Sequence, residues 1–446
     1  MNKNEWRKVK LGDVISARNE RYKPDDDYIS KLQRIDKIDF TGNIFLSNNP
    51  SKTDMILIKP GDFVISGINV AKGALAVYNG TEEVSATIHY SSYTLNEKEL
   101  YLDYFKSFLR SSEFLRLLQE QIPGGIKTEV KPKHILPLEI SLPPLSEQKR
   151  ISAKLQSIQA QHTELTAEIQ NQKSYIKQLK QAILQDAVTG KLTEDWRKTQ
   201  AGKNAGNARE LLEQIKAEKE KLIAEGKIKK QKPLPPIKQE EIPFDLPAGW
   251  VWTRLGVVID DKPKNGYSPK EVSYPTEIKS LKLGATTWGT FNSNEYKYID
   301  EVIPKESPYW LKNGDILIQR SNSLDYVGVS AVYDREDFQF IYPDLMMKIR
   351  SVIISAKSLH LLLSSPYMRN YFRANAKGAQ KTMPKINQDI VINALLPLPP
   401  LAEQEEIVRR VDVLFAQVKE LEQEVEKREK YAESLMQVVL SEALRG

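Results

Sequence analysis

The sequence contains no cysteine, which excludes disulfide bonds, a thiolate nucleophile and any zinc site built on cysteine. It has no apolar run of membrane-spanning length, and residues 1–16 lack the hydrophobic region of a secretory signal. We therefore expect a cytoplasmic protein without membrane association. The net charge of +6 over 446 residues is modest, so it permits a nucleic-acid partner without arguing strongly for one.

Catalytic motifs are missing as well. The sequence has no G-x-x-x-x-G-K-[ST] phosphate loop, no G-x-G-x-x-G fingerprint and no Asn/Asp-Pro-Pro-Tyr cluster for an amino-methyltransferase. Pro343-Asp344 is not followed by the Glu-x-Lys that a nuclease needs to hold a metal. The histidines are too dispersed to suggest a local metal site; they are His89, His134, His162 and His360. We expect a chain that is not an enzyme and binds no cofactor or metal.

The sequence does contain a repeat of a long helical pattern. From Ile151 to Ile183, core positions follow one another at steps of four and three, which is the a/d spacing of a coiled coil. The same ladder returns between Ile407 and Val439. Both ladders follow a Leu-Pro-Pro-Leu-(Ser/Ala)-Glu-Gln segment, at 142–148 and 398–404, whose prolines prevent an earlier helix start. Long helices are predicted over 146–190 and 398–446.

The two helices are expected to pair antiparallel, since each follows its own globular domain. If all the core layers overlap, Ile151 lies opposite Val439 and Ile183 lies opposite Ile407. This register places His162 and Arg428 in one layer, where a neutral imidazole would accept a hydrogen bond from the guanidinium. Exposure of both side chains at the surface is the alternative.

The segments before the two helices also resemble each other. Residues 1–145 and 244–397 each open on a Trp-containing strand that ends in Leu-Gly, and each carries a Gly-Asp turn before an apolar strand. Loops of different length on a repeated frame predict two copies of one binding module with different ligands. Residues 191–243 form a charged helix and a linker rich in proline and lysine. The apolar stripe of that helix, containing Leu211 and Ile215, must pack on this protein or on a partner.

The repeated helix starts, Gly190-Lys191-Leu192-Thr193 with Trp196-Arg197, and Leu246-Pro247-Ala248-Gly249-Trp250 together resemble the specificity subunits of type I restriction–modification systems over the whole chain. The resemblance implies an α/β (α+β) fold with pseudo-two-fold symmetry. In it, two target-recognition domains are separated by a long antiparallel two-helix coiled coil. Each domain reads one half of a bipartite double-stranded DNA site, and the helix pair fixes the spacer. One departure is that no Leu-Pro-x-Gly segment precedes Trp6.

The resemblance also implies partners. Catalysis is expected in two methyltransferase subunits that use S-adenosylmethionine and in restriction subunits that use ATP and magnesium. Residues 196–232, with Trp196 and the apolar stripe of the charged helix, are the expected docking site for a methyltransferase subunit. A coiled-coil scaffold whose repeated domains bind proteins is the alternative function.

Three polar stretches in each domain are candidates for DNA contact, because cations bind phosphates while amide and guanidinium groups read base edges. An ordinary solvated loop is the alternative for any one stretch, and their matching positions in the two domains favour recognition. The candidates in the first domain are Arg18, Asn19, Arg21, Tyr22, Lys23, Ser66, Asn69, Lys72, Lys127 and Lys131. Those in the second are Lys262, Lys264, Asn265, Tyr267, Gln319, Arg320, Ser321, Asn322, Lys377, Gln380, Lys381 and Lys385.

Overall fold

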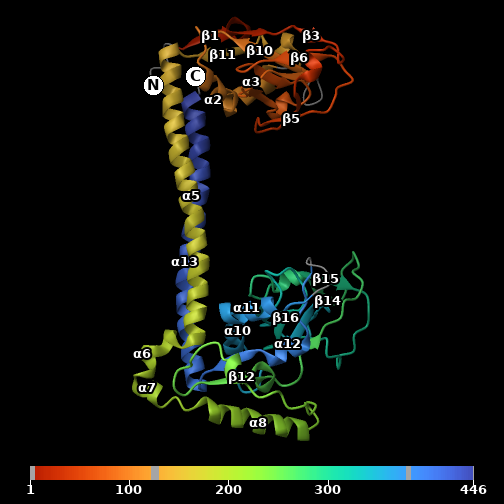
Figure 1. Ribbon diagram of the computed structural model, residues 1–446, viewed down its shortest axis with the longest axis vertical. Coiled ribbons are helices and arrows are strands. Elements are labelled where there is room, and N and C mark those ends of the chain that lie inside the picture. The colour runs from red at the N-terminus through yellow and green to blue at the C-terminus, as the bar shows by residue number, and fades with distance from the viewer. Residues whose placement is uncertain (1–5, 122–129, 378–382, 445–446) are drawn as a thin grey trace. The chain divides into compact units, whose positions relative to one another are not determined.

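The structure is a computed structural model that describes residues 6–121, 130–377 and 383–444. No helix in these ranges is long and apolar enough to cross a membrane. The chain divides into unit 1, Met1–Asn171 with Val425–Gly446, and unit 2, Gln172–Glu424. Each unit holds a globular domain and one part of both long helices, α5 (Leu145–Thr189) and α13 (Leu401–Leu444) (Figure 1).

The globular domain of unit 1 mixes short strands with short helices. Its elements are β1 (Arg7–Lys10), α1 (Leu11–Val14), β2 (Ile15–Ala17), β3 (Arg21–Tyr22), η2 (Ile29–Lys31), β4 (Arg34–Ile38), β5 (Ile44–Ser47), β6 (Met55–Ile58), β7 (Phe63–Ser66), η3 (Val70–Lys72), β8 (Leu75–Val77), β9 (Val84–Thr87), β10 (Tyr90–Leu95), α2 (Leu102–Leu109), α3 (Ser112–Gln121), α4 (Pro132–Ile135) and β11 (Glu139–Leu142).

Unit 2 has a helical segment before its globular domain. Its elements between the long helices are η5 (Lys191–Thr193), α6 (Glu194–Arg197), α7 (Gln200–Lys203), α8 (Ala208–Ala224), η6 (Gln239–Glu241), β12 (Val251–Arg254), α9 (Leu255–Val258), β13 (Lys264–Asn265), β14 (Ile278–Leu281), η7 (Leu283–Ala285), β15 (Tyr296–Ile299), β16 (Ile316–Gln319), β17 (Ser330–Val332), β18 (Phe340–Ile341), β19 (Met346–Ile349), α10 (Ala356–Ser364), α11 (Pro366–Asn375), α12 (Gln388–Asn393) and β20 (Leu395–Leu398).

The two globular domains share one frame. A four-stranded antiparallel sheet has the order β2-β10-β7-β8 in unit 1 and β13-β19-β16-β17 in unit 2. A two-stranded sheet joins the first and last strands of each domain, β1 with β11 and β12 with β20. The remaining sheets differ, with order β3-β6-β9-β4-β5 in unit 1 and β15-β14-β18 in unit 2. The predicted repeat is therefore confirmed, and the domains diverge in this additional sheet.

The four-stranded sheet of unit 2 has a separate hydrophobic core on each face. Side chains alternate along β16, so Ile316 and Ile318 pack with Leu359 and Phe372 of the helices. Leu317 packs on the other face, among residues of the additional sheet. In unit 1, Phe63 and Ile65 of β7 pack with the helices and Val64 packs with the additional sheet. The strands are buried on both faces, which explains their continuous apolar sequences.

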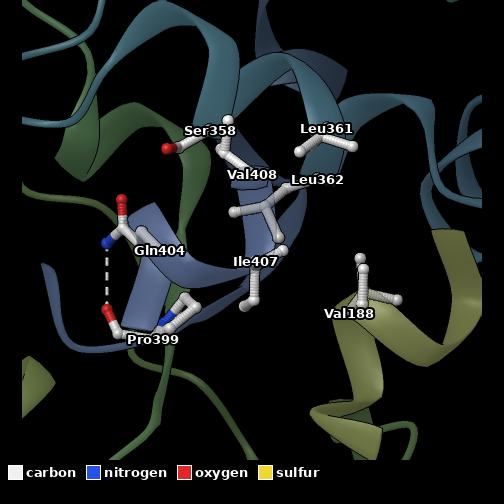
Figure 2. A pocket seen from close by; sticks show the side chains of 9 residues that line it. Val188, Ser358, Leu361, Leu362, Pro399, Gln404, Ile407 and Val408 are labelled. Carbon is white, nitrogen blue, oxygen red and sulfur yellow. Dashed lines mark hydrogen bonds between the residues drawn. The ribbon is translucent and has the colours of Figure 1, made fainter. Parts of the chain in front are cut away.

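The glutamine of each helix start fixes the chain where α5 or α13 begins. Gln148 Nε2 donates to the carbonyl oxygen of Pro143, and Gln404 Nε2 donates to that of Pro399, both at 2.9 Å. Figure 2 shows the second contact beside the apolar cluster that Ile407 and Leu362 help to form. The repeated Leu-Pro-Pro-Leu-x-Glu-Gln sequence therefore holds the last strand of each domain against its long helix.

The long helices are antiparallel in each unit, but the predicted register is wrong. Gln170 Nε2 donates to Glu429 Oε1 at 3.4 Å in unit 1, and Lys180 pairs with Glu422 at 2.8 Å in unit 2. The predicted register puts these glutamates about 13 and 18 Å along the axis from their partners, which is out of reach. A displacement of α13 by about one turn shortens both offsets, and it places the buried Ile176 opposite the buried Val418.

The predicted hydrogen bond between His162 and Arg428 is not formed through the imidazole Nε2. That atom is buried without a hydrogen-bond partner among the described residues, and Arg428 is exposed. In the displaced register His162 lies level with Ala432, which is buried. The predicted polar layer of His162 and Arg428 is therefore absent, and apolar packing sets the register of the two helices.

Only part of the predicted a/d ladder is buried between the helices. Val418 and Val425 of α13 are buried, as are Ile169 and Ile176 of α5, so one position per heptad forms this seam. The alternate positions are much more open, and their exposed fractions are 41% for Leu165, 43% for Leu179, 50% for Leu421 and 56% for Leu435. In each unit the helix pair thus keeps an exposed row of leucines beside a narrow buried seam.

The apolar stripe of the charged helix packs on the protein itself. Ala208, Leu211 and Ile215 of α8 are buried in the core between the sheet and helices of unit 2. Lys219 Nζ adds hydrogen bonds to the carbonyl oxygens of Gly256 at 3.1 Å and Ile259 at 2.7 Å. The buried part of this stripe is therefore not available to a methyltransferase subunit, and docking of such a subunit elsewhere on residues 196–232 stays a prediction.

Candidate nucleic-acid interface

Each four-stranded sheet carries a buried aspartate at the turn before its central strand. Asp62 and Asp315 are 3% and 2% exposed, and each accepts a hydrogen bond from the backbone nitrogen three residues earlier. Arg18 binds both oxygens of Asp62 at 2.9 and 3.0 Å, which raises the pKa of this guanidinium. Arg18 is therefore held inside unit 1 by an ion pair and is not a free phosphate ligand.

The three predicted stretches of unit 2 meet at one edge of the sheet. These stretches are residues 262–267, 319–323 and 377–387, called first, second and third here. The Ile386 nitrogen donates to the carbonyl oxygen of Arg320 at 3.0 Å, which joins the second stretch to the third. Ser321 and Lys385 also form a backbone bridge. Gln388 Nε2 donates to the carbonyl oxygen of Pro263 at 2.6 Å, which ties the first stretch to the start of α12.

A cavity of about 220 Å³ lies where these stretches meet, and it is lined by Asn265, Arg320, Asn387, Gln388 and Asp389. Asn265 Oδ1 and Arg320 Nε are buried without hydrogen-bond partners among the described residues. An amide and a guanidinium are the groups that read base edges in a DNA groove.

The predicted stretches of unit 1 also come together. The Val130 nitrogen donates to the carbonyl oxygen of Gly67 at 2.8 Å, and the Arg18 nitrogen donates to that of Ser92 at 2.9 Å. They border a cavity of about 320 Å³ whose described lining includes the cations Arg21 and Lys131. The lining residues are Arg18, Asn19, Arg21, Ile56, Ile88, His89, Tyr90, Ser91, Ser92, Val130, Lys131 and Pro132.

Three predicted DNA-contacting side chains are buried, so the prediction of direct contact is wrong for them. Gln319 is 0%, Ser321 1% and Ser66 8% exposed. Gln319 Nε2 donates to Thr286 Oγ1 at 3.0 Å, and its Oε1 accepts from Asn322 Nδ2 at 2.7 Å. A polar residue at the end of a strand is ambiguous in sequence, because it can face a ligand or satisfy a buried loop.

Several other candidates are engaged within the protein. Lys23 pairs with Asp54 at 3.2 Å, and Lys72 lies over the Phe40 ring at 5.6 Å. Tyr22 donates to Glu20, and Tyr267 donates to Glu301 while stacking on Tyr309. Asn69 precedes η3, and Lys377 pairs with Lys385 through the backbone. Three candidates lie outside the described residues: Lys127, Gln380 and Lys381.

The first stretch of unit 2 divides between two faces of the sheet, because side chains alternate along β13. Asn265 borders the cavity described above, whereas Lys262 and Lys264 border a second cavity of about 440 Å³. This basic cavity is also lined by Lys227, Lys305, Lys312, Lys348 and Arg350. These cations were not among the predicted site residues, because they lie far apart in the sequence. Within the described ranges, no three His, Asp or Glu side chains are grouped to hold a metal ion.

The sequence and the fold both resemble those of known proteins. The profile described as "Type I restriction modification DNA specificity domain" matches residues 3–172 and 264–428, which is one match per repeated half. The chain belongs to the type I restriction–modification specificity family. The first match includes the candidate loops of unit 1 and a part of α5. The second match begins after Lys262, and it includes the other candidate loops of unit 2 and a part of α13.

Curated relatives agree with this family. The chain is 33% identical over 246 residues to the EcoEI specificity subunit of Escherichia coli, and 26% identical over 431 residues to the EcoKI specificity subunit of strain K12. These alignments cover 54% and 94% of this chain, and 40% and 82% of the respective relative. The chain thus aligns with less than half the length of the EcoEI subunit and with most of the EcoKI subunit.

Two solved structures share the fold. A chain from a study of type I R-M complex assembly and conformational transition superposes with a TM-score of 0.62 at 20% identity, covering 99% of this chain and 98% of that one. The HsdS subunit from Thermoanaerobacter tengcongensis superposes with a TM-score of 0.56 at 20% identity, covering 99% and 97%. The α/β architecture of two repeated domains with long helices is therefore confirmed.

Proposed function

We propose that this specificity-family chain is the non-catalytic subunit that directs a type I restriction–modification complex to a bipartite DNA site. Each unit reads one half-site through its candidate loops. The observation that carries the proposal is the convergence of three separate stretches at one sheet edge in unit 2, joined by the Ile386–Arg320 and Gln388–Pro263 contacts. Unpartnered polar atoms of Asn265 and Arg320 border that edge.

The two units are suited to different sequences. Both cavities present amide and guanidinium groups, but unit 1 adds His89 and Lys131 to its lining whereas unit 2 adds Asp389. Guanidinium and amide groups form paired hydrogen bonds with purine edges, and lysines bind phosphates without sequence preference. Since the frame is common and the loops differ, each domain provides its own half of the specificity.

Catalysis is assigned to partner subunits. We propose two methyltransferase subunits that bind S-adenosylmethionine, and restriction subunits that use ATP and magnesium. We propose that α5 and α13, which both contribute to each unit, set the number of base pairs between the two half-sites. The exposed leucines of the helix pair, including Leu421 and Leu435, offer an apolar surface for an amphipathic helix of a methyltransferase subunit.

The decisive experiment maps methylated adenines in DNA from cells that express this chain with its methyltransferase subunits. The expected result is one bipartite motif with a spacer of constant length. Exchange of residues 1–145 for the corresponding domain of another family member is then expected to change one half of the motif and leave the other half intact. A motif that changes in both halves would contradict independent reading.

The scaffold alternative is tested with the purified complex. Sequence-specific binding to a duplex carrying the mapped motif is expected to weaken steeply as salt increases, because cations of the complex release counterions from phosphates. A protein-binding scaffold predicts no preference for the mapped duplex over a scrambled duplex of the same composition. The purified chain alone is expected to transfer no methyl group.

A further inference from the structure

An exposed tryptophan lies on a loop that is hydrogen-bonded to Gln319, the residue before Arg320 of the candidate site in unit 2. Trp288 is 78% exposed in the loop between η7 and β15. Residues just before Trp288 are buried, since Ala285 at the end of η7 and Thr286 are both 0% exposed. Large aromatic side chains dominate the energetics of binding surfaces and are rarely so open in a folded domain. The exposure is therefore a property of Trp288 and not of the whole loop.

The loop that presents Trp288 is fixed on both sides. Before it, Gln319 Nε2 donates to the Leu283 carbonyl at 3.1 Å and to Thr286 Oγ1 at 3.0 Å. After it, His360 Nε2 lies 3.0 Å from the carbonyl oxygen of Gly289. Burial lowers the pKa of His360 to about 4, so the imidazole is neutral and donates this bond from Nε2. A loop held in this way loses little conformational freedom when its apex binds.

The same glutamine connects the loop to the reading stretch. Gln319 directly precedes Arg320, and its Oε1 accepts a hydrogen bond from Asn322 Nδ2 at 2.7 Å. One buried side chain therefore sets both the loop of Trp288 and the 319–323 stretch. Thr286, two residues before Trp288, is thus hydrogen-bonded to the side chain that directly precedes Arg320.

We propose that Trp288 stacks against bases of the half-site that unit 2 reads, entering the duplex as an aromatic wedge. This inference rests on the proposed function. An indole carries no charge to bind phosphate, and its flat apolar face matches the face of a base. Apolar wedges at base steps unstack the duplex locally, and an inserted aromatic ring replaces part of the lost stacking. A rigid loop with an exposed tryptophan is suited to this task.

The experiment measures affinity of the complete complex, this chain with its methyltransferase subunits, for a duplex carrying the mapped bipartite motif. Trp288→Ala is expected to weaken binding about tenfold to hundredfold, which is the range for loss of one aromatic–base stack. Trp288→Phe is expected to retain most of the affinity, and Trp288→Leu is not, because leucine is apolar without a stacking face. Val302→Ala is the matched control, since Val302 is 94% exposed in the same unit.

A second measurement uses the same duplex with a single mismatched pair moved along the second half-site. A base step that is already unstacked needs no wedge, so the deficit of Trp288→Ala is expected to shrink at one position only. Binding to the first half-site is the internal control, because mismatches there leave the deficit unchanged.

Failure of this inference is distinguishable from failure of the proposed function. If the wild-type complex does not prefer the mapped duplex, the proposed function is wrong. If it does and Trp288→Ala binds equally well, the wedge is wrong. A Trp288→Ala chain that loses a methyltransferase subunit on gel filtration identifies the tryptophan as a protein contact and also overturns the wedge. Thermal melting of each variant checks the fold, and Phe against Leu decides the question if Ala is destabilised.

Discussion

The indole Nε1 of Trp250 donates a hydrogen bond of 2.8 Å to Oε2 of Glu403. The other carboxylate oxygen, Oε1, accepts from Thr193 Oγ1 at 2.7 Å and from Arg197 at 2.5 Å. Glu403 is 1% exposed, so this buried anion is neutralised and fully bonded by three segments. The Gly-Lys-Leu-Thr…Trp-Arg and Leu-Pro-Ala-Gly-Trp sequences thus meet at the start of α13.

The corresponding residues of unit 1 make different contacts. Trp6 Nε1 is buried without a hydrogen-bond partner among the described residues. Glu147, the equivalent of Glu403, is bound by Arg150 of its own helix at 2.7 Å, which lowers the pKa of Glu147. The repeat therefore preserves the residues of this contact without preserving the contact.

The first prediction concerns removal of the buried anion. Glu403→Ala is expected to destabilise unit 2 by about 3–5 kcal/mol, because Arg197 and the Trp250 indole lose their acceptor while staying partly buried. Glu405→Ala is the matched control, since Glu405 is exposed on the same turn of α13 and is expected to change stability little. Urea unfolding followed by tryptophan fluorescence measures both, and equal midpoints for the two variants would contradict the role of Glu403.

The second prediction concerns acid. Arg410 holds the pKa of Asp195 at about 2, and Arg409 with Arg410 lowers the pKa of Glu406 to about 2. Both folded values lie below the ordinary values of 3.8 and 4.5, so these pairs stabilise the fold fully above about pH 5. The contribution is lost as pH falls from about 4.5 toward 2. The variant Glu406→Gln is expected to flatten the pH dependence of the melting temperature in this window, and a slope equal to that of wild type would refute the linkage.

The existence of the long helices is predictable from sequence, and their register is not. Periodic a/d positions specify a helix with an apolar seam, and the prolines at 143–144 and 399–400 specify where it starts. A displacement of one turn keeps an apolar residue opposite an apolar residue, so the pattern fits more than one pairing. Polar residues such as His162 were expected to decide between them, but cross-helix pairs such as Lys180 with Glu422 show the observed register.

The candidate site is predictable as a set of stretches and less so as a set of side chains. The repeat locates the loops, because the same positions follow the same strands in both units. Exposure of each side chain depends on loops that differ between the units, as Gln319 demonstrates by bonding to Thr286. Lys348 and Arg350 escape notice in the sequence because β19 brings them to Asp315 only through strand pairing.

The third prediction tests the narrow seam of the helix pair. Val418→Ala is expected to destabilise the protein by about 1.5–2.5 kcal/mol, because a side chain with 2% exposure leaves a cavity. Leu421→Ala, three residues further along α13, is expected to cost far less, since Leu421 is 50% exposed. The predicted consequence of Leu421→Ala is weaker assembly with methyltransferase subunits, measured by titration calorimetry. Equal destabilisation by both substitutions would show that both positions are buried in solution.

The last prediction separates base reading from phosphate binding at Arg320. Its Nε has no hydrogen-bond partner among the described residues, and its NH1 lies 3.3 Å from the carbonyl oxygen of Asp344. If the guanidinium reads a base edge, Arg320→Ala weakens binding to the mapped duplex about tenfold to hundredfold and relaxes the preference at one base pair. Arg335→Ala, with an exposed side chain on the turn after β17, is the control and is expected to leave affinity unchanged. Binding is measured for duplexes substituted at each position of the half-site and over a range of salt concentrations. A uniform loss across all substituted duplexes, with a salt slope smaller by about one, would place Arg320 on a phosphate and contradict direct reading.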